Sequence, residues 1–177
     1  MMRSKWLLAV LLALAVPATA RAAPAPIDCV LEKLDPATRS AIEADVRANL
    51  EQQGEQHYSE ASRTPIANAS LQCANALGWD ENRRTAAAKY ALVRVAVEIV
   101  RATLAARGID PDRVVRGYQA VPPQRRRAEL GKEDYEFVAG ALVANGTLKN
   151  AADGYLVGNY LGMLNLIDVS QAAFAVP

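Results

Sequence analysis

The stretch "DENRRTAAAKYALVRVAVEIVRATLAARG", Asp80 to Gly108, is the longest helical pattern in the chain and decides its fold class. Asp80 is a suitable N-cap, and Gly108 is a suitable residue for ending the helix. The polar side chains between them fall on a narrow strip that holds Arg84, Arg94, Glu98 and Arg101. A helix that is apolar over most of its circumference must be covered on several sides. The stretch therefore predicts a long central helix.

The same stretch also predicts which face of this helix is buried. Apolar residues recur at spacings of three and four, which is the period of one helix face, and they comprise Ala88, Leu92, Val95, Ile99, Ala102 and Ala106. The charged residues argue against a membrane-spanning helix, because charges inside a bilayer are costly. We expect this stripe to face the core of a bundle of helices.

Helix signals recur on both sides of the long helix. Asp35–Pro36, Thr64–Pro65 and Asp110–Pro111 each place a capping residue before a proline, which suits the first helical position. Thr147 is a further candidate cap, and Gly78 a candidate stop. No alternating strand pattern bounded by turns is present. The sequence predicts an all-α fold, a compact bundle of about five to seven helices with a long central helix and a glycine-striped C-terminal helix.

The glycine stripe lies in "GYLVGNYLGMLNLI", residues 154–167. Gly154, Gly158 and Gly162 share one face of the last predicted helix, although each interior glycine costs about 1 kcal/mol relative to alanine. Similar spacing of small residues allows two helices to approach closely. We expect close helix packing at these three glycines, with the long helix of the same molecule as the favoured neighbour. A contact between copies is the alternative, and a monomer is favoured over an oligomer.

The first 22 residues have the layout of a secretory signal peptide. Arg3 and Lys5 form a basic start, an unbroken apolar run extends over residues 6–16, and small residues follow in "PATARA". The run is shorter than the roughly 20 residues that a membrane-spanning helix needs. Cleavage after Ala20 or Ala22 fits the small-residue rule, and Ala22 is favoured. We expect no membrane span after signal removal.

Without this signal peptide the chain is slightly acidic. The signal holds three of the 20 basic side chains and no acid, which leaves 17 basic and 19 acidic side chains and a net charge of −2. A general nucleic-acid-binding protein carries a strong basic excess, so the charge argues against nucleic acid as a partner. The remaining residues, 23–177, match the usual size of one domain. We expect a single helical domain there.

Cys29 and Cys73 are the two cysteines of the chain. An even number in an exported chain predicts a disulfide, because the compartments outside the cytoplasm are oxidising. Neither cysteine belongs to a CxxC redox pair. With a single histidine in the chain, a zinc site has too few cysteine and histidine ligands. We therefore expect a Cys29–Cys73 disulfide, and neither a metal nor a cofactor.

Three groups of polar residues resemble fragments of a catalytic site, but each is better explained without one. His57 is the single histidine and lies in a polar loop with no second metal ligand near it. Asp153 and Asp168 bracket the apolar part of the last helix, where solvent-facing acids are expected. The basic run at residues 125–127 is followed at once by acids, which is typical of a solvated face. The sequence thus predicts no catalytic residue.

These observations favour an exported protein, periplasmic or extracellular, that is not an enzyme. We expect a non-catalytic binding or interaction protein of the cell envelope, whose partner is an envelope protein or a small ligand. One alternative is a small envelope enzyme with an active site assembled from scattered acidic residues. Another is a membrane-associated oligomer formed through the glycine stripe.

Overall fold

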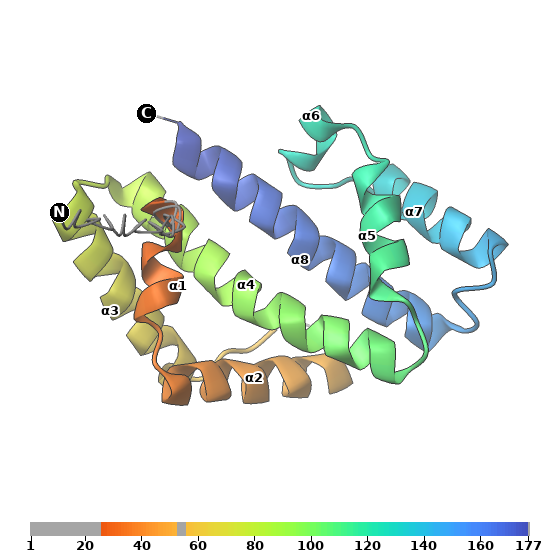
Figure 1. The fold of residues 1–177 in the computed structure, drawn as a ribbon, viewed down its shortest axis with the longest axis horizontal. Coiled ribbons are helices and arrows are strands. Elements are labelled where there is room, and N and C mark those ends of the chain that lie inside the picture. The colour runs from red at the N-terminus through yellow and green to blue at the C-terminus, as the bar shows by residue number, and fades with distance from the viewer. Residues whose placement is uncertain (1–25, 53–55, 177) are drawn as a thin grey trace, which may run out of the picture.

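The fold is built on an antiparallel pair of long helices, α4 (Glu81–Ala106) and α8 (Ala151–Ala175). In Figure 1 they run side by side, and the end of α8 lies beside the start of α4. Every shorter helix that packs on this pair does so at one of its two sides. The expected central helix is α4, and its principal partner is the glycine-striped helix α8.

The computed structural model describes residues 26–52 and 56–176, so the predicted signal peptide lies outside the described residues. All regular elements in these ranges are helical, which confirms the all-α fold. Eight α-helices are present where about five to seven were expected, and α1 and α6 have only five and four residues. Besides α4 and α8, the elements are η1 (Pro26–Asp28), α1 (Cys29–Lys33), α2 (Pro36–Glu51), α3 (Glu60–Leu77), α5 (Pro111–Gln119), α6 (Pro123–Arg126) and α7 (Lys132–Ala144).

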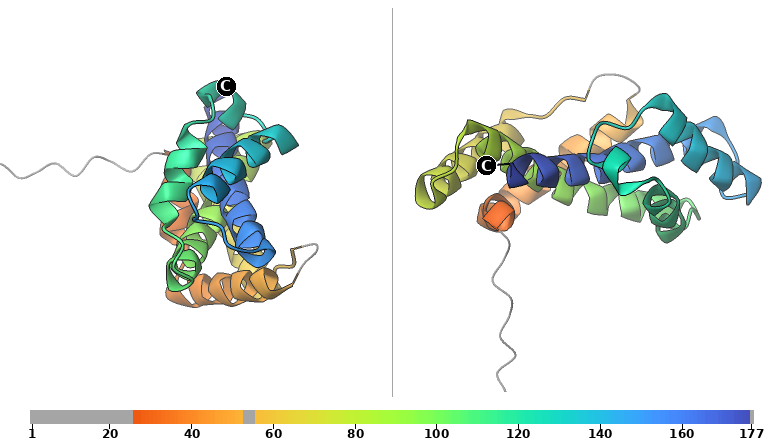
Figure 2. Two further views of the ribbon diagram at one scale, coloured as in Figure 1. Left: turned by 90° about the vertical axis from the view of Figure 1, so that its right-hand side faces the viewer. Right: turned by 90° about the horizontal axis from the view of Figure 1, so that it is seen from above.

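The shorter helices fall into two groups. Helices α1, α2 and α3 pack against α4, whereas α5, α6 and α7 pack against α8. Figure 1 shows the two groups on opposite sides of the long pair, and Figure 2 shows α2 lying across one end of it. The core between these layers contains Ile42, Val100, Leu104, Tyr160 and Leu161, all essentially inaccessible to solvent. Each such side chain stabilises the fold by roughly 1.5–3 kcal/mol through burial.

The predicted aspartate caps are present at three helices. A carboxylate oxygen of Asp35 accepts from the Thr38 amide at 2.7 Å, and Asp80 accepts from the Arg83 amide at 2.8 Å. Asp110 caps α5 in the same way. These bonds satisfy amide groups that a helix leaves unpaired at its N-terminus.

Two helix starts differ from the sequence prediction. Helix α3 begins at Glu60 and not after Thr64, because Asp45 of α2 accepts hydrogen bonds from the amide and hydroxyl of Ser59 and from the hydroxyl of Ser62. This contact between helices fixes a start that local signals do not mark. Helix α8 begins at Ala151, where the side chain of Asn150 accepts from an amide of the first turn.

The buried face of α4 also differs from the predicted stripe. Of the six stripe residues only Ile99 is fully buried, while Ala102 and Ala106 are exposed. The face that enters the core includes Tyr90, Val93, Val97, Val100 and Leu104. Because α4 is apolar nearly all round, its sequence allows several faces to be buried, and the positions of α8 and the shorter helices decide between them.

The predicted cysteine pair is at disulfide distance. The sulfur atoms of Cys29 and Cys73 lie 2.07 Å apart, and their Cα atoms lie 6.1 Å apart. This separation is within the normal range for a disulfide. The bond joins the start of α1 to the buried side of α3. No helix among the residues that the structure describes is long and apolar enough to cross a membrane.

Candidate ligand-binding site

The three glycines of the stripe do not all pack closely against a neighbour. A Cβ atom added at Gly154 or Gly158 would meet no other heavy atom within 4 Å, whereas one at Gly162 would lie 3.4 Å from the Tyr135 hydroxyl. The expected contact with the long helix of the same molecule is therefore absent at Gly154 and Gly158. Helix α8 nevertheless packs closely on α4. Its face opposite the glycines carries the buried residues Leu156, Tyr160 and Met163.

Two of these glycines instead line an open groove with tyrosines on its sides. This tyrosine groove has a volume of about 360 Å³, and its lining includes Tyr58, Tyr135, Tyr155, Gly158 and Gly162. Burial, with the negative charge of Asp45, raises the pKa of Tyr58. Burial together with nearby acids also raises the pKa of Tyr135. Both hydroxyls therefore stay protonated near neutral pH.

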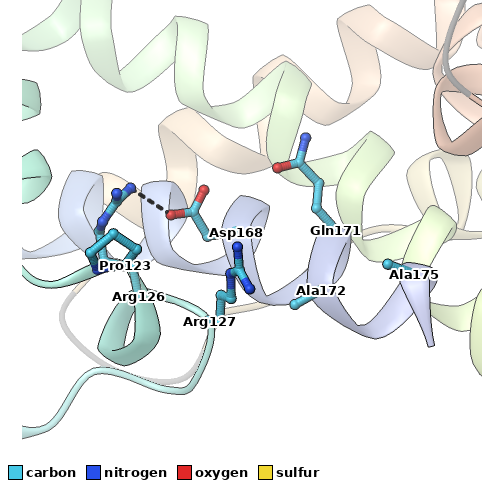
Figure 3. A pocket seen from close by; sticks show the side chains of 7 residues that line it. All are labelled: Pro123, Arg126, Arg127, Asp168, Gln171, Ala172 and Ala175. Atoms are coloured by element: carbon cyan, nitrogen blue, oxygen red, sulfur yellow. Dashed lines mark hydrogen bonds and ion pairs between the residues drawn. The ribbon is translucent and has the colours of Figure 1, made fainter.

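A second hollow, which we name the arginine pocket, lies between α6 and the C-terminal half of α8. Its volume is about 470 Å³, and Figure 3 shows its lining, which consists of Pro123, Arg126, Arg127, Asp168, Gln171, Ala172 and Ala175. Two guanidinium groups and one carboxylate give it a formal charge of +1. Small apolar side chains from the last turns of α8 complete its wall.

Arg126 and Asp168 form a partly buried ion pair at one side of this pocket. Nη1 of Arg126 lies 2.9 Å from Oδ2 of Asp168, and the two side chains are 21% and 27% exposed. Nε of Arg126 donates to the carbonyl of Val121 at 3.1 Å. The guanidinium carbon also lies 5.2 Å from the ring centroid of Tyr118, in a cation–π contact. These contacts hold the Arg126 guanidinium in one position.

The hydroxyl of Tyr118 completes the cluster. It donates to the same Oδ2 atom of Asp168 at 2.9 Å. Burial, together with the hydrogen bond to the Asp168 carboxylate, raises the pKa of Tyr118 well above its ordinary value. The hydroxyl is therefore a permanent donor at physiological pH and not a general base, since a base must lose its proton near the working pH.

Asn165, one helical turn before Asp168, positions the segment that carries the arginines. Its amide nitrogen donates to the carbonyls of Arg126 and Ala128, and its oxygen accepts from the amide of Leu130. Asn165 is 3% exposed, so this side chain is buried with all of these bonds made. A satisfied buried polar network of this kind favours one arrangement of the backbone. The pocket wall is therefore fixed on α8 before any ligand arrives.

Two charged groups at the pocket remain available to a ligand. Both intramolecular bonds to Asp168 use Oδ2, and Oδ1 accepts no hydrogen bond from the described residues. Arg127 makes neither an ion pair nor a side-chain hydrogen bond within residues 26–52 and 56–176. Arg127 and Gln171 both line the pocket, and Figure 3 shows the Gln171 side chain directed away from the Arg127 guanidinium. The pocket thus presents a negatively charged hydrogen-bond acceptor, Oδ1 of Asp168, and a positively charged donor, the Arg127 guanidinium. These two groups are not paired with each other.

The other residues weighed from the sequence do not assemble into a catalytic group. His57 is exposed, and its backbone is held by hydrogen bonds to the side chain of Asn49. Asp153 and Asp168 lie 15 residues apart on one straight helix, a separation of roughly 22 Å. Asp153 is buried, contrary to expectation, and it accepts from the amide of Lys149 at 3.3 Å.

The basic run differs most from its prediction as a solvated face. Arg126 pairs with Asp168, and Arg125 lies 2.6 Å from a carboxylate oxygen of Asp134, whose side chain is 7% exposed. The sequence carries a weak signal for these contacts. Prolines 122 and 123 turn the chain sharply before the run, which brings it back onto α8. The partner in α8 lies 42 residues away, so no local pattern identifies it.

Comparison of the chain with protein-family models, with curated proteins and with solved structures finds no match in any of the three.

Proposed function

We propose that the protein is exported and acts in the cell envelope as a non-catalytic binding protein whose ligand occupies the arginine pocket. Two observations support export. The first 22 residues have the pattern of a signal peptide, and Cys29 and Cys73 lie at disulfide distance, which suits an oxidising compartment. Either the periplasm or the extracellular medium fits both observations.

The observation that carries the binding role is the fixed charged cluster of the arginine pocket. Arg126 and Asp168 are held by Tyr118 and the Val121 carbonyl, and Asn165 fixes the backbone behind them. A ligand that enters the pocket meets groups that need not reorganise, which lowers the cost of binding. The volume of about 470 Å³ falls within the usual range for small-molecule sites.

The properties of the tyrosines favour binding over catalysis. Tyr58, Tyr118 and Tyr135 have raised pKa values because they are buried, so their hydroxyls serve as hydrogen-bond donors. An enzyme built from the scattered acids would need two carboxylates close enough to act on one bond. The two aspartates that the sequence suggested, Asp153 and Asp168, are roughly 22 Å apart along their helix.

A contact between copies is the second candidate, and a specific observation favours it. Gly154 and Gly158 have open space beside them, so the backbone of a second helix can approach there. Such a contact would bury the exposed neighbour Leu166, which is 44% accessible. It is compatible with ligand binding in the arginine pocket, because Gly154 and Gly158 lie in the N-terminal half of α8 and the pocket is lined by its C-terminal half.

The experiment is a binding screen of the mature, oxidised protein produced by export. Thermal unfolding is recorded with mixtures of small metabolites, and each mixture is analysed by mass spectrometry before and after incubation. We expect one chemical class to raise the melting temperature without being converted, since a ligand at 100 times its Kd stabilises by about 2.7 kcal/mol. Conversion of the ligand would favour the enzyme alternative, and a screen without any stabilising class would contradict the proposal.

The export part has its own measurement. Cell fractionation followed by mass spectrometry of the intact protein gives both the location and the N-terminus. We expect a mature chain that begins at or near Ala23, outside the cytoplasm. An intact Met1 N-terminus on the envelope-associated protein would contradict signal cleavage.

A further inference from the structure

We infer that the arginine pocket binds a small zwitterion, which places its carboxylate on Arg127 and its ammonium group on Oδ1 of Asp168. This inference rests on the proposed binding function and names the ligand class of the same site. The argument uses the position of the unpaired charges, the role of Arg126 and the apolar wall.

The first step is that the two available charges, on Asp168 and Arg127, are not paired with each other. Asp168 lines the pocket and uses Oδ2 for both of its intramolecular bonds, and Oδ1 accepts no hydrogen bond from the described residues. Arg127 lines the same pocket but makes no ion pair with Asp168 or with any other described residue. A ligand with a negative and a positive end can bridge this gap, and each end then forms a charge-assisted hydrogen bond.

The second step favours a zwitterion over a simple anion. An anion on Arg127 alone would share the pocket with the free oxygen of Asp168, and that oxygen would remain without a donor. Arg126 is already engaged, since its Nη1 donates to Oδ2 and its Nε to the Val121 carbonyl, and none of its N–H groups bonds to Oδ1. A ligand that carries both signs satisfies both groups, and sites lined by both signs select for such ligands.

The third step concerns the part of the ligand between or beside its charged ends. Ala172 and Ala175 provide small apolar surface on α8, and Pro123 lies on the opposite wall (Figure 3). The volume of about 470 Å³ exceeds what a single small amino acid fills. The pocket therefore suits an amino acid with an apolar side chain or a short apolar peptide whose two termini are free.

The experiment measures binding of defined probes to the mature, disulfide-containing protein by isothermal titration calorimetry. The probes are L-alanine, L-leucine and L-alanyl-L-alanine. N-acetyl-L-leucine lacks the ammonium group, and L-leucinamide lacks the carboxylate, so each removes one half of the zwitterion. We expect at least one uncapped probe to bind with 1:1 stoichiometry and each capped compound to bind at least about tenfold more weakly, since each loses one charged hydrogen-bonded contact.

Two variants test the position of the site. Arg127→Gln removes the cation of the pocket and is expected to weaken the best probe by about tenfold or more. Arg107→Gln is the matched control, because Arg107 is also exposed and caps α4 at the opposite end of the α4–α8 pair. We expect it to leave the affinity unchanged. Far-ultraviolet circular dichroism and a thermal melt establish that both variants are folded.

The outcomes separate this inference from the binding function. Capped compounds that bind as tightly as the zwitterion, or an Arg127→Gln variant with unchanged affinity, would overturn the ligand assignment. Absence of binding by all three uncapped probes would overturn it as well. If the metabolite screen meanwhile finds another stabilising class, the protein remains a binding protein with a different ligand.

Discussion

Asp168 connects three helices at the candidate site. One carboxylate oxygen accepts from Tyr118 of α5 and from Arg126 of α6, so a single side chain on α8 holds two shorter helices. A partly buried ion pair contributes more than a solvent-exposed pair because water screens it less. Under the proposed binding function, its second oxygen also contacts the ligand, so a substitution at Asp168 is expected to affect both stability and binding.

Asp168→Asn is therefore expected to destabilise the fold by about 1–3 kcal/mol, because the Arg126 guanidinium loses its charged acceptor while it remains largely buried. Denaturant unfolding of the mature protein measures the effect. Asp112→Asn is the control, since Asp112 pairs with Arg101 at 2.7 Å on the surface and is 58% exposed. That pair is expected to contribute at most about 1 kcal/mol. Equal losses in the two variants would contradict the structural role of Asp168.

Asp45 makes stability depend on pH. Burial raises the pKa of Asp45, but hydrogen bonds from Ser62 and Ser59 outweigh it, so the net pKa lies below the usual 3.8. A depressed carboxyl pKa contributes stability that is present above the unfolded-state pKa and is lost as the pH falls below it. We expect Asp45→Asn to cost about 1 kcal/mol at pH 7. The difference from the parent protein should shrink as the pH drops below 3.8.

Melting temperatures between pH 7 and pH 3 test this expectation. Glu43→Gln on the same helix serves as the control, because Glu43 pairs with Arg47 on the exposed surface of α2. A stability difference for Asp45→Asn that is constant across this pH range would show that the carboxylate charge is not involved.

Among the elements, α8 shows that regularly spaced glycines need not pack closely against a neighbouring helix of the same molecule. Gly154 and Gly158 have space for a Cβ atom, and a helix gains up to about 1 kcal/mol when alanine replaces glycine. We expect Gly154→Ala and Gly158→Ala each to raise the free energy of unfolding. Gly117→Ala in α5 provides the contrast, because its Cβ would lie 2.9 Å from a methyl group of buried Val138. That variant should lose about 1–3 kcal/mol through overpacking.

Denaturant melts and sedimentation of the three variants distinguish the possible roles of the stripe. Unchanged mass with increased stability at Gly154 and Gly158 would leave the glycines without a packing role. A dimer that dissociates in either variant would instead identify the stripe as a contact between copies. Lower stability without a change in mass would contradict the open space beside these residues.

The sequence predicted those elements whose signals are local. The starts of α2, α4 and α5 follow from an aspartate cap, and for α2 and α5 from the proline after it, because both effects act within one turn. The start of α3 was missed, since Asp45 determines it from another helix. The buried face of α4 was wrong for the related reason that its sequence permits several faces.

Almost none of the contacts in the candidate site could be predicted from the sequence. Arg126 and Asp168 each belong to a region with many charges, and nothing near either residue indicates that they meet across 42 positions. The central position of α4, by contrast, followed from composition alone, because an apolar helix must be enclosed. Cys29 and Cys73 lie at disulfide distance, and two cysteines allow only one pairing.

For the whole molecule, the cysteine pair ties the N-terminal helices together. It joins α1 to α3 across 44 positions of sequence, and Cys73 is fully buried. Closing such a loop stabilises by roughly 2–4 kcal/mol, largely by restricting the unfolded chain. We expect Cys29→Ala to lower the melting temperature of the oxidised protein, and a reducing agent to lower that of the parent protein to a similar value. Two free thiols in the denatured, unreduced native protein would contradict the disulfide.

The antiparallel pairing of α4 with α8 sets the order in which the helices can pack during synthesis, because the N-terminal part of the chain leaves the ribosome first. Helices α1 to α3 and the disulfide can form early, but the side of α4 that α8 covers stays bare until the last helix is released. Trp79 and Phe174, whose ring centroids lie 5.0 Å apart, then meet to close the pair at its far end. During synthesis this side of α4 therefore stays exposed until the residues between α4 and α8 have been added to the chain. The exposed apolar surface is therefore greatest just before α8 is complete, and α8 covers it when the long pair closes.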